Sequence, residues 1–186
     1  MGKVHAEIDD KLAKMIQAQH VFFVATAPLA TEGSLNLSPK GLDSFRILGP
    51  RTVAYLDVIG SGVETIAHLK ENGRIILMFC AFDGPPNIVR LHGRGRVVES
   101  DSAEFPGLAA QFPQYRSARA IIVVEVTRIC DSCGFGVPLM KYEGERDQHF
   151  SWADKKGPEG LKVYKQEKNR RSIDGLPGLS ESGLAE

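Results

Sequence analysis

The sequence predicts a mainly β fold, an antiparallel β-barrel with peripheral helices. Segments rich in β-branched and aromatic residues follow one another at short spacing, as strands do. Turn signals such as Gly49-Pro50 and Gly84-Pro85-Pro86 separate them. Helical patterns interrupt these segments at only two interior places, whereas a doubly wound parallel sheet needs a helix between nearly every pair of strands. An antiparallel barrel therefore fits the sequence better.

The elements follow in a simple order. Ile8, Leu12, Met15 and Ile16 have the spacing of one apolar helix face, which predicts an N-terminal helix. Residues 21–26 and 34–38, separated by the Gly33 turn, predict a hairpin. The remaining expected elements are strands at 44–48, 52–58, 74–82, 88–99 and 120–129 and helices at 63–71 and 102–111.

The length of 186 residues suits one domain with a substantial core. We expect a single domain over residues 1–174, including the N-terminal helix and a C-terminal extension that is helical in part between 151 and 168. Residues 175–186 hold Gly, Pro and Ser with few apolar side chains, which indicates a flexible tail.

Charge and hydropathy restrict the partners. Lys plus Arg and Asp plus Glu both number 23, so no overall field recruits nucleic acid or an anionic membrane. Arg90, Arg94 and Arg96 alternate along one predicted strand and are interpreted as its solvent-facing side rather than a nucleic-acid site. The longest apolar run, 75–82, is too short to span a bilayer. We expect a soluble, cytoplasmic protein with a small-molecule partner.

The cysteines predict neither a disulfide framework nor a metal site. The chain has 3 cysteines, and Cys130 and Cys133 form a lone C-x-x-C without two further ligands at metal-binding spacing. Two ordinary reduced thiols flanking a turn are the preferred interpretation, and no metal is expected.

The turn Gly60-Ser61-Gly62 lies between the predicted strand 52–58 and the predicted helix 63–71. A strand that passes through such a turn into a helix start directs several free N–H groups at one spot, where the helix dipole favours an anion. Alternatively, the two glycines only allow a tight connection and Ser61 is the helix N-cap.

A second polar segment is Asn36-Leu37-Ser38-Pro39-Lys40-Gly41. On a strand, Asn36, Ser38 and Lys40 share one face and offer an amide, a hydroxyl and an ammonium in a row. The alternative is a solvated strand face. Together with the turn at 60–62, however, the row provides the cation and the dense donors that a phosphate needs.

The ordered set of these segments resembles the pyridoxamine 5′-phosphate oxidase-like flavoproteins, the split-barrel family that binds FMN between two subunits. The resemblance covers roughly residues 5–130 and indicates a branch distinct from the true pyridoxamine phosphate oxidases. It rests on Phe22-Phe23-Val24-Ala25-Thr26, the segment 36–41, Tyr55-Leu56-Asp57, the segment 61–69, Asn72-Gly73-Arg74-Ile75-Ile76-Leu77-Met78-Phe79, and the segment 90–98 with Gly93.

The resemblance implies an FMN-binding flavoprotein, a homodimer with FMN at the subunit interface, and an oxidoreductase acting on an unknown small molecule. The alternative is a non-catalytic flavin- or ligand-binding split barrel, which includes one that has lost FMN. No catalytic residue is assigned, because the flavin carries the chemistry. The implied cofactor-binding residues are Asn36, Ser38, Lys40, Gly41, Asp57, Ser61, Gly62, Thr65, Arg170 and Arg171.

One departure from the family pattern stands out. The family commonly has an arginine or lysine directly after the serine of the turn, where this chain has Gly62 and Val63. The positive charge for a phosphate must then come from Lys40, from backbone donors, or from Arg170 or Arg171 in the C-terminal segment, for which a solvated basic turn is the alternative.

Overall fold

The computed structural model describes residues 2–185. The helices are α1 (Asp10–Gln17), α2 (Glu64–Asn72), α3 (Phe105–Ala109), α4 (Gln148–Lys168) and α5 (Glu181–Ala185). The strands are β1 (Val4–His5), β2 (Phe22–Thr26), β3 (Asn36–Lys40), β4 (Phe45–Gly49), β5 (Thr52–Val58), β6 (Arg74–Cys80), β7 (Ile88–Glu99) and β8 (Ala118–Ser132).

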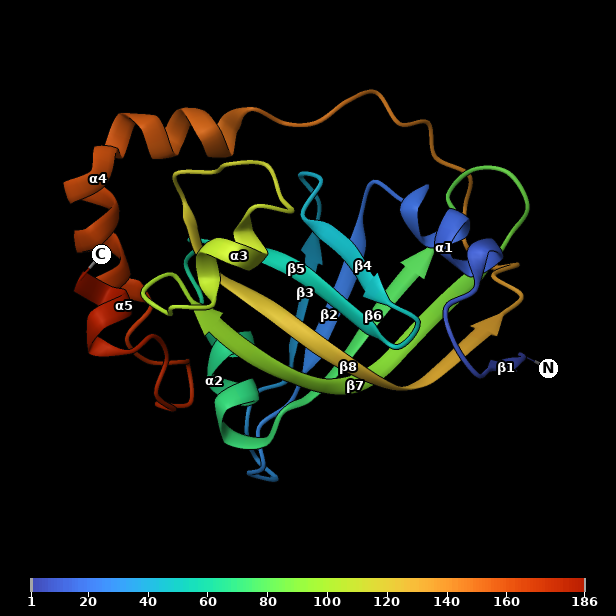
Figure 1. Ribbon diagram of the computed structural model, residues 1–186, viewed down its shortest axis with the longest axis horizontal. Coiled ribbons are helices and arrows are strands. Elements are labelled where there is room, and N and C mark those ends of the chain that lie inside the picture. The colour runs from blue at the N-terminus through green and yellow to red at the C-terminus, as the bar shows by residue number, and fades with distance from the viewer. Residues whose placement is uncertain (1, 186) are drawn as a thin grey trace.

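The strands form one curled sheet of 8 strands in the order β3-β2-β6-β7-β8-β5-β4, with β1 added beside β8 (Figure 1). Every pairing is antiparallel. The predicted fold class is therefore confirmed, and each predicted strand has its counterpart. Only the two-residue β1 lacks a signal in the sequence, because so short an element shows no period.

The core fills the inside of the curled sheet. Alternate residues of the strands point inward, and the main cluster runs from Ile8 near the N-terminus to Leu184 near the C-terminus. The long strand β7 bends at a register shift between His92 and Gly93. A β-carbon at Gly93 would collide with the carbonyl oxygen of Glu125, so only glycine allows β7 and β8 to approach so closely there.

The predicted hairpin of β2 and β3 is confirmed by its register, in which Val24 faces Ser38 and Thr26 faces Asn36. Because β3 pairs only with β2, it forms one end of the sheet, while β4 forms the other. These two strands are consecutive in the chain but stand at opposite ends of the strand order. The candidate site lies where β3, the end of β5 and the start of α2 come together.

The start of helix α2 decides against the alternative in which Ser61 is the helix N-cap. Its N-cap is Val63, with no side-chain hydrogen bond, so Ser61 is not the N-cap. The helix ends at Gly73, whose φ of 70° is the left-handed conformation typical of a glycine C-cap. The first-turn N–H groups of α2 consequently have no side-chain cap from this residue.

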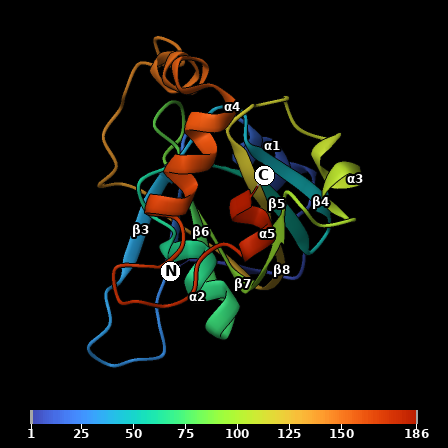
Figure 2. The same cartoon turned by 90° about the vertical axis from the view of Figure 1, so that its left-hand side faces the viewer.

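The C-terminal extension packs against one end of the barrel. Helix α4 bends sharply at Gly157, with φ 63°, and together with α5 covers that end beside α2 (Figure 2). No helix in residues 2–185 combines the length and apolar character needed to cross a membrane.

Residues 175–185, expected to belong to a flexible tail, pack against the barrel in the structure. Leu179 is 5% exposed and Leu184 1% exposed, and the backbone N–H and hydroxyl of Ser180 both donate to Glu99 Oε2 at 2.8 Å. Composition alone is misleading here, because the two leucines join the main hydrophobic cluster and Ser180 bonds the buried carboxylate of Glu99.

We predict that Leu184→Ala lowers the free energy of unfolding by about 2–5 kcal/mol, the range for a large-to-small change in a core. Urea denaturation followed by circular dichroism measures it. Ile173→Ala, in the same C-terminal segment but 75% exposed, is the matched control and should change little. Equal stability of the Leu184 variant and the wild type would show that the tail is not part of the cooperative core.

Candidate functional site

A cavity of about 460 Å³ lies between the end of β3, the end of β5 and the start of α2. The structure brings the two predicted segments together there. Most of the predicted binding residues line this cavity: Asn36, Ser38, Lys40, Gly41, Ser61, Gly62 and Thr65. The side of β3 that carries the polar row faces inward, while Leu37, between two of its members, is 68% exposed on the opposite side.

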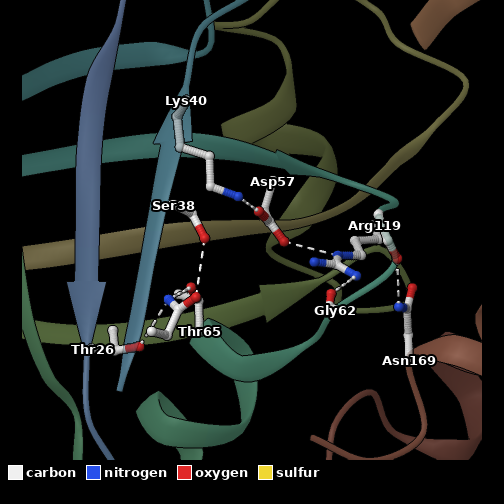
Figure 3. Close-up of polar contacts among 10 residues, drawn as sticks. Thr26, Ser38, Lys40, Asp57, Gly62, Thr65, Arg119 and Asn169 are labelled. Carbon is white, nitrogen blue, oxygen red and sulfur yellow. Dashed lines mark hydrogen bonds and ion pairs between the residues drawn. The ribbon is translucent and has the colours of Figure 1, made fainter. Parts of the chain in front are cut away.

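Hydrogen bonds tie the polar row of β3 to α2. The Ser38 hydroxyl donates to Asn36 Oδ1 at 3.0 Å, and Asn36 Nδ2 donates to Thr65 Oγ1 at 2.9 Å (Figure 3). A second contact runs from Asn36 Nδ2 to Thr26 Oγ1 at 3.2 Å. Asn36 therefore positions the hydroxyl of Thr65 relative to β3, and both hydroxyls remain at the cavity wall.

Behind this row lies His68, which is fully buried. Its Nδ1 is 2.9 Å from Thr26 Oγ1, and Nε2 has no hydrogen-bond partner within residues 2–185. Burial lowers the pKa of His68 despite the nearby carboxylates of Asp174, Glu64 and Glu71. A neutral imidazole in this place supports the wall and does not line the cavity.

The carboxylate of Asp57 is the centre of the charged part of the site. It is 0% exposed and accepts from Lys40 Nζ at 2.7 Å through Oδ1 and from Arg119 Nε at 2.8 Å through Oδ2 (Figure 3). Burial by itself raises the pKa of Asp57, but the charges of Arg119 and Lys40 outweigh it and lower the pKa to about 2. Asp57, predicted as a binding residue, is thus not at the cavity wall; it holds two cations that are.

Arg119, on β8, is the main residue that the sequence reasoning missed. Its side chain is 5% exposed, it lines the cavity, and Nη1 donates to the carbonyl oxygen of Gly62 at 2.9 Å. A signal existed, since an arginine within the apolar run 118–124 must have a buried partner. That partner, Asp57, is 62 residues away, as Figure 3 shows.

The two predicted arginines of the C-terminal segment do not reach the cavity in this chain. Arg170 pairs with Glu181, and Arg171 Nη1 donates to the carbonyl oxygen of Gly175 at 2.8 Å. Their neighbour Asn169 is the residue that contacts the site: it is 0% exposed and its Nδ2 donates to the carbonyl oxygen of Gly60 at 2.9 Å. The C-terminal segment thereby anchors the turn at 60–62.

Two further residues complete the wall. Glu64 lines the cavity, and its Oε1 accepts from the backbone N–H of Ile173 at 3.2 Å. A β-carbon at Gly62 would collide with Oε2 of this glutamate. His149, from the start of α4, lies at the cavity with its Nε2 2.7 Å from Ser117 Oγ, and burial lowers its pKa. Within residues 2–185, no three His, Cys, Asp or Glu side chains form a group that could hold a metal ion.

The arrangement is that of a split barrel: an open antiparallel barrel whose polar cavity has lysine, arginine and hydroxyl groups in its wall. The sequence pattern of the pyridoxamine 5′-phosphate oxidase family matches residues 8–133. A curated relative, the pyridoxamine 5′-phosphate oxidase family protein ustO of Aspergillus flavus, is 38% identical over 192 aligned positions, which cover 94% of this chain and 77% of that protein. The chain belongs to the pyridoxamine 5′-phosphate oxidase family.

Solved structures agree on the fold. The HupZ protein of Group A Streptococcus superposes with a TM-score of 0.52 at 22% identity, covering 66% of this chain and 91% of that chain. A protein of Lactobacillus delbrueckii, described as a candidate pyridoxamine 5′-phosphate oxidase, gives a TM-score of 0.52 at 17% identity, covering 68% and 98%. At these identities the likeness establishes the split-barrel fold.

We predict that the stability difference between the wild type and Asp57→Asn depends on pH. The pKa of Asp57 is lowered on folding, so the carboxylate stabilises the fold above about pH 4 and this contribution is lost as the pH falls toward about 2. Near neutral pH the substitution leaves two cations without their buried partner, at about 3–5 kcal/mol. Between about pH 6 and about pH 2 the difference should shrink by about 2 kcal/mol.

Urea unfolding at a series of pH values measures this difference. Asp101→Asn, at an exposed position, is the control and should leave unfolding close to that of the wild type throughout. If the stability difference between the wild type and Asp57→Asn stayed constant or grew on acidification, the ion pairs of Asp57 with Lys40 and Arg119 would be contradicted.

Proposed function

We propose that the protein binds FMN and is an FMN-dependent oxidoreductase acting on a small organic molecule. The proposal rests on the composition of the cavity wall. Lys40 and Ser38 of β3 and Thr65 of α2 line the cavity beside the start of α2, whose N-cap residue makes no side-chain hydrogen bond. A phosphate monoester requires a cation and several N–H or O–H donors at one spot, and this wall provides both.

The donors fit the phosphate end of the cofactor. Ser38, Lys40, Ser61 and Thr65 would hold the phosphate, and the N–H groups of the turn at 60–62 would add neutral donors. Asn36 would contribute indirectly, because its side chain holds the hydroxyl of Thr65 in place. When bound, FMN supplies hydride or electron transfer, and the protein contributes binding, orientation and electrostatics.

A second function is favoured by one observation. Glu64 brings a carboxylate into the cavity beside Gly62, the position at which the family commonly has a cation. A negative charge there weakens phosphate binding and favours a split barrel that binds flavin or another ligand without turnover. Holoprotein whose flavin is neither reduced nor oxidised by any small molecule of a broad redox panel would support this second function.

We further propose a homodimer formed through the outer face of β3, β2 and β6. In register across these strands lie two rows, Leu37-Ala25-Ile76 and Pro39-Phe23-Met78, which leave apolar side chains at the surface. Leu35 is also 83% exposed next to them. A contiguous apolar face beside an edge strand is unfavourable in water and typical of an interface.

A cytoplasmic location is proposed on the state of the thiols. Cys80, Cys130 and Cys133 are all free cysteines, and Cys133 is exposed. Free thiols suit a reducing compartment, where disulfides are rare.

The cofactor test uses purified protein incubated with FMN and desalted. We expect a yellow protein that bleaches with dithionite and recolours in air. Lys40→Ala should weaken FMN binding at least about tenfold, or about 1.4 kcal/mol, because a charge-assisted contact to the phosphate is removed. Lys11→Ala, on the exposed side of α1, is the control. A colourless protein that retains no FMN would refute the proposed function.

The dimer test is sedimentation velocity. The wild type should sediment as a dimer and Leu37→Glu as a monomer, since the new charge would lie in an apolar interface. Val163→Glu, on a 51% exposed position of α4, should remain dimeric. A monomeric wild type would contradict the proposed interface.

A further inference from the structure

We propose that Arg119 supplies the cavity with the cation that the chain lacks after Ser61, and that Asp57 is the positioning residue that aims it. The inference rests on the proposed function, because the anion is taken to be the phosphate of FMN. It assigns to a strand far along the chain a role that family members commonly give to the residue next to the serine.

The backbone explains how a β8 residue reaches this place. In the pairing of β5 with β8, Asp57 faces Ala120 and Val58 faces Ala118, so Arg119 is the extra residue of a β-bulge. A bulge leaves its extra residue unpaired and re-aims its side chain. Here the side chain turns toward the cavity, where its guanidinium lies between Asp57 and the carbonyl oxygen of Gly62 (Figure 3).

The guanidinium retains a free edge. Nε donates to Asp57 and Nη1 to Gly62, while Nη2 has no acceptor within residues 2–185. The side chain is 5% exposed and lines the cavity. A charged group that is nearly buried, with unused donors beside a polar cavity, is suited to bind an anionic oxygen there.

The charged groups around Asp57 carry a local positive excess. One buried carboxylate, Asp57, lies between two cations, Lys40 and Arg119, which leaves one positive charge in excess among these three side chains. The carboxylate of Glu64, elsewhere in the cavity wall, opposes this excess; its Oε1 accepts from the backbone N–H of Ile173 on the side of the C-terminal segment. Since Asp57 accepts from each cation through a different oxygen, it holds the ammonium of Lys40 and the guanidinium of Arg119 next to one carboxylate.

The test compares FMN with riboflavin, which lacks the phosphate, by fluorescence titration of the full chain. Arg119→Gln should raise the Kd for FMN about tenfold or more and leave the Kd for riboflavin within about twofold of the wild type. Arg116→Gln is the matched control, an arginine close by in sequence whose side chain is 74% exposed; it should change neither Kd. A selective loss of FMN affinity supports a phosphate contact.

Two results would overturn the inference while leaving FMN binding intact: an Arg119→Gln variant with unchanged FMN affinity, or one that loses both flavins equally, which indicates a purely structural role. A wild type that binds neither flavin would instead refute the proposed function. Removing the arginine leaves the buried Asp57 carboxylate with one partner, which can prevent folding. In that case the double variant Asp57→Asn/Arg119→Gln is used instead. It is assessed by the same comparison of FMN affinity with riboflavin affinity.

Discussion

The ion pair between Lys40 and Asp57 joins the two ends of the sheet. Strand β3 is at one end of the strand order and β5, with β4, is at the other, and within residues 2–185 no strand pairing closes the barrel between them. A carboxylate removed from water is costly unless it is paired, and Asp57 obtains both partners from other strands, Lys40 on β3 and Arg119 on β8. The ion pairs of Asp57 with Lys40 and Arg119 therefore link the two ends of the sheet through side chains.

The cavity lies at this opening because side chains, rather than backbone hydrogen bonds between paired strands, span it. Asn36 adds a neutral bridge from β3 to Thr65 on α2, and Asn169 anchors the turn at 60–62 from the opposite side. The C-terminal segment, which lies beyond the part of the chain matched by the family pattern, is consequently part of the site's support. The polar groups of the cavity wall are thus held from β3, from α2 and from the C-terminal segment, which is the kind of preorganisation that lowers the cost of binding a ligand.

Local patterns explain what could be predicted. The strands and the hairpin follow from alternation over a few residues, and the polar row of β3 follows from the same period of two, which requires no knowledge of the partner strand. The turn at 60–62 was placed correctly because its neighbours in sequence form it. The alternative in which Ser61 is the N-cap does not hold, because the helix begins two residues later, and helix boundaries are uncertain by a residue or two from sequence. Arg170 and Arg171 were chosen for their charge, although Asn169, their neutral neighbour, makes the contact.

By itself, the sequence determined the antiparallel fold, the polar face of β3 and the glycine-serine turn, because each is encoded in residues close together along the chain. Only the tertiary structure decided which cations stand at the cavity and that Asp57 lies behind them. A bulge in the pairing of β5 with β8 brings Arg119 to residues far earlier in the chain. Ion pairs of that kind depend on strand register and on the closure of the sheet, which no local period records.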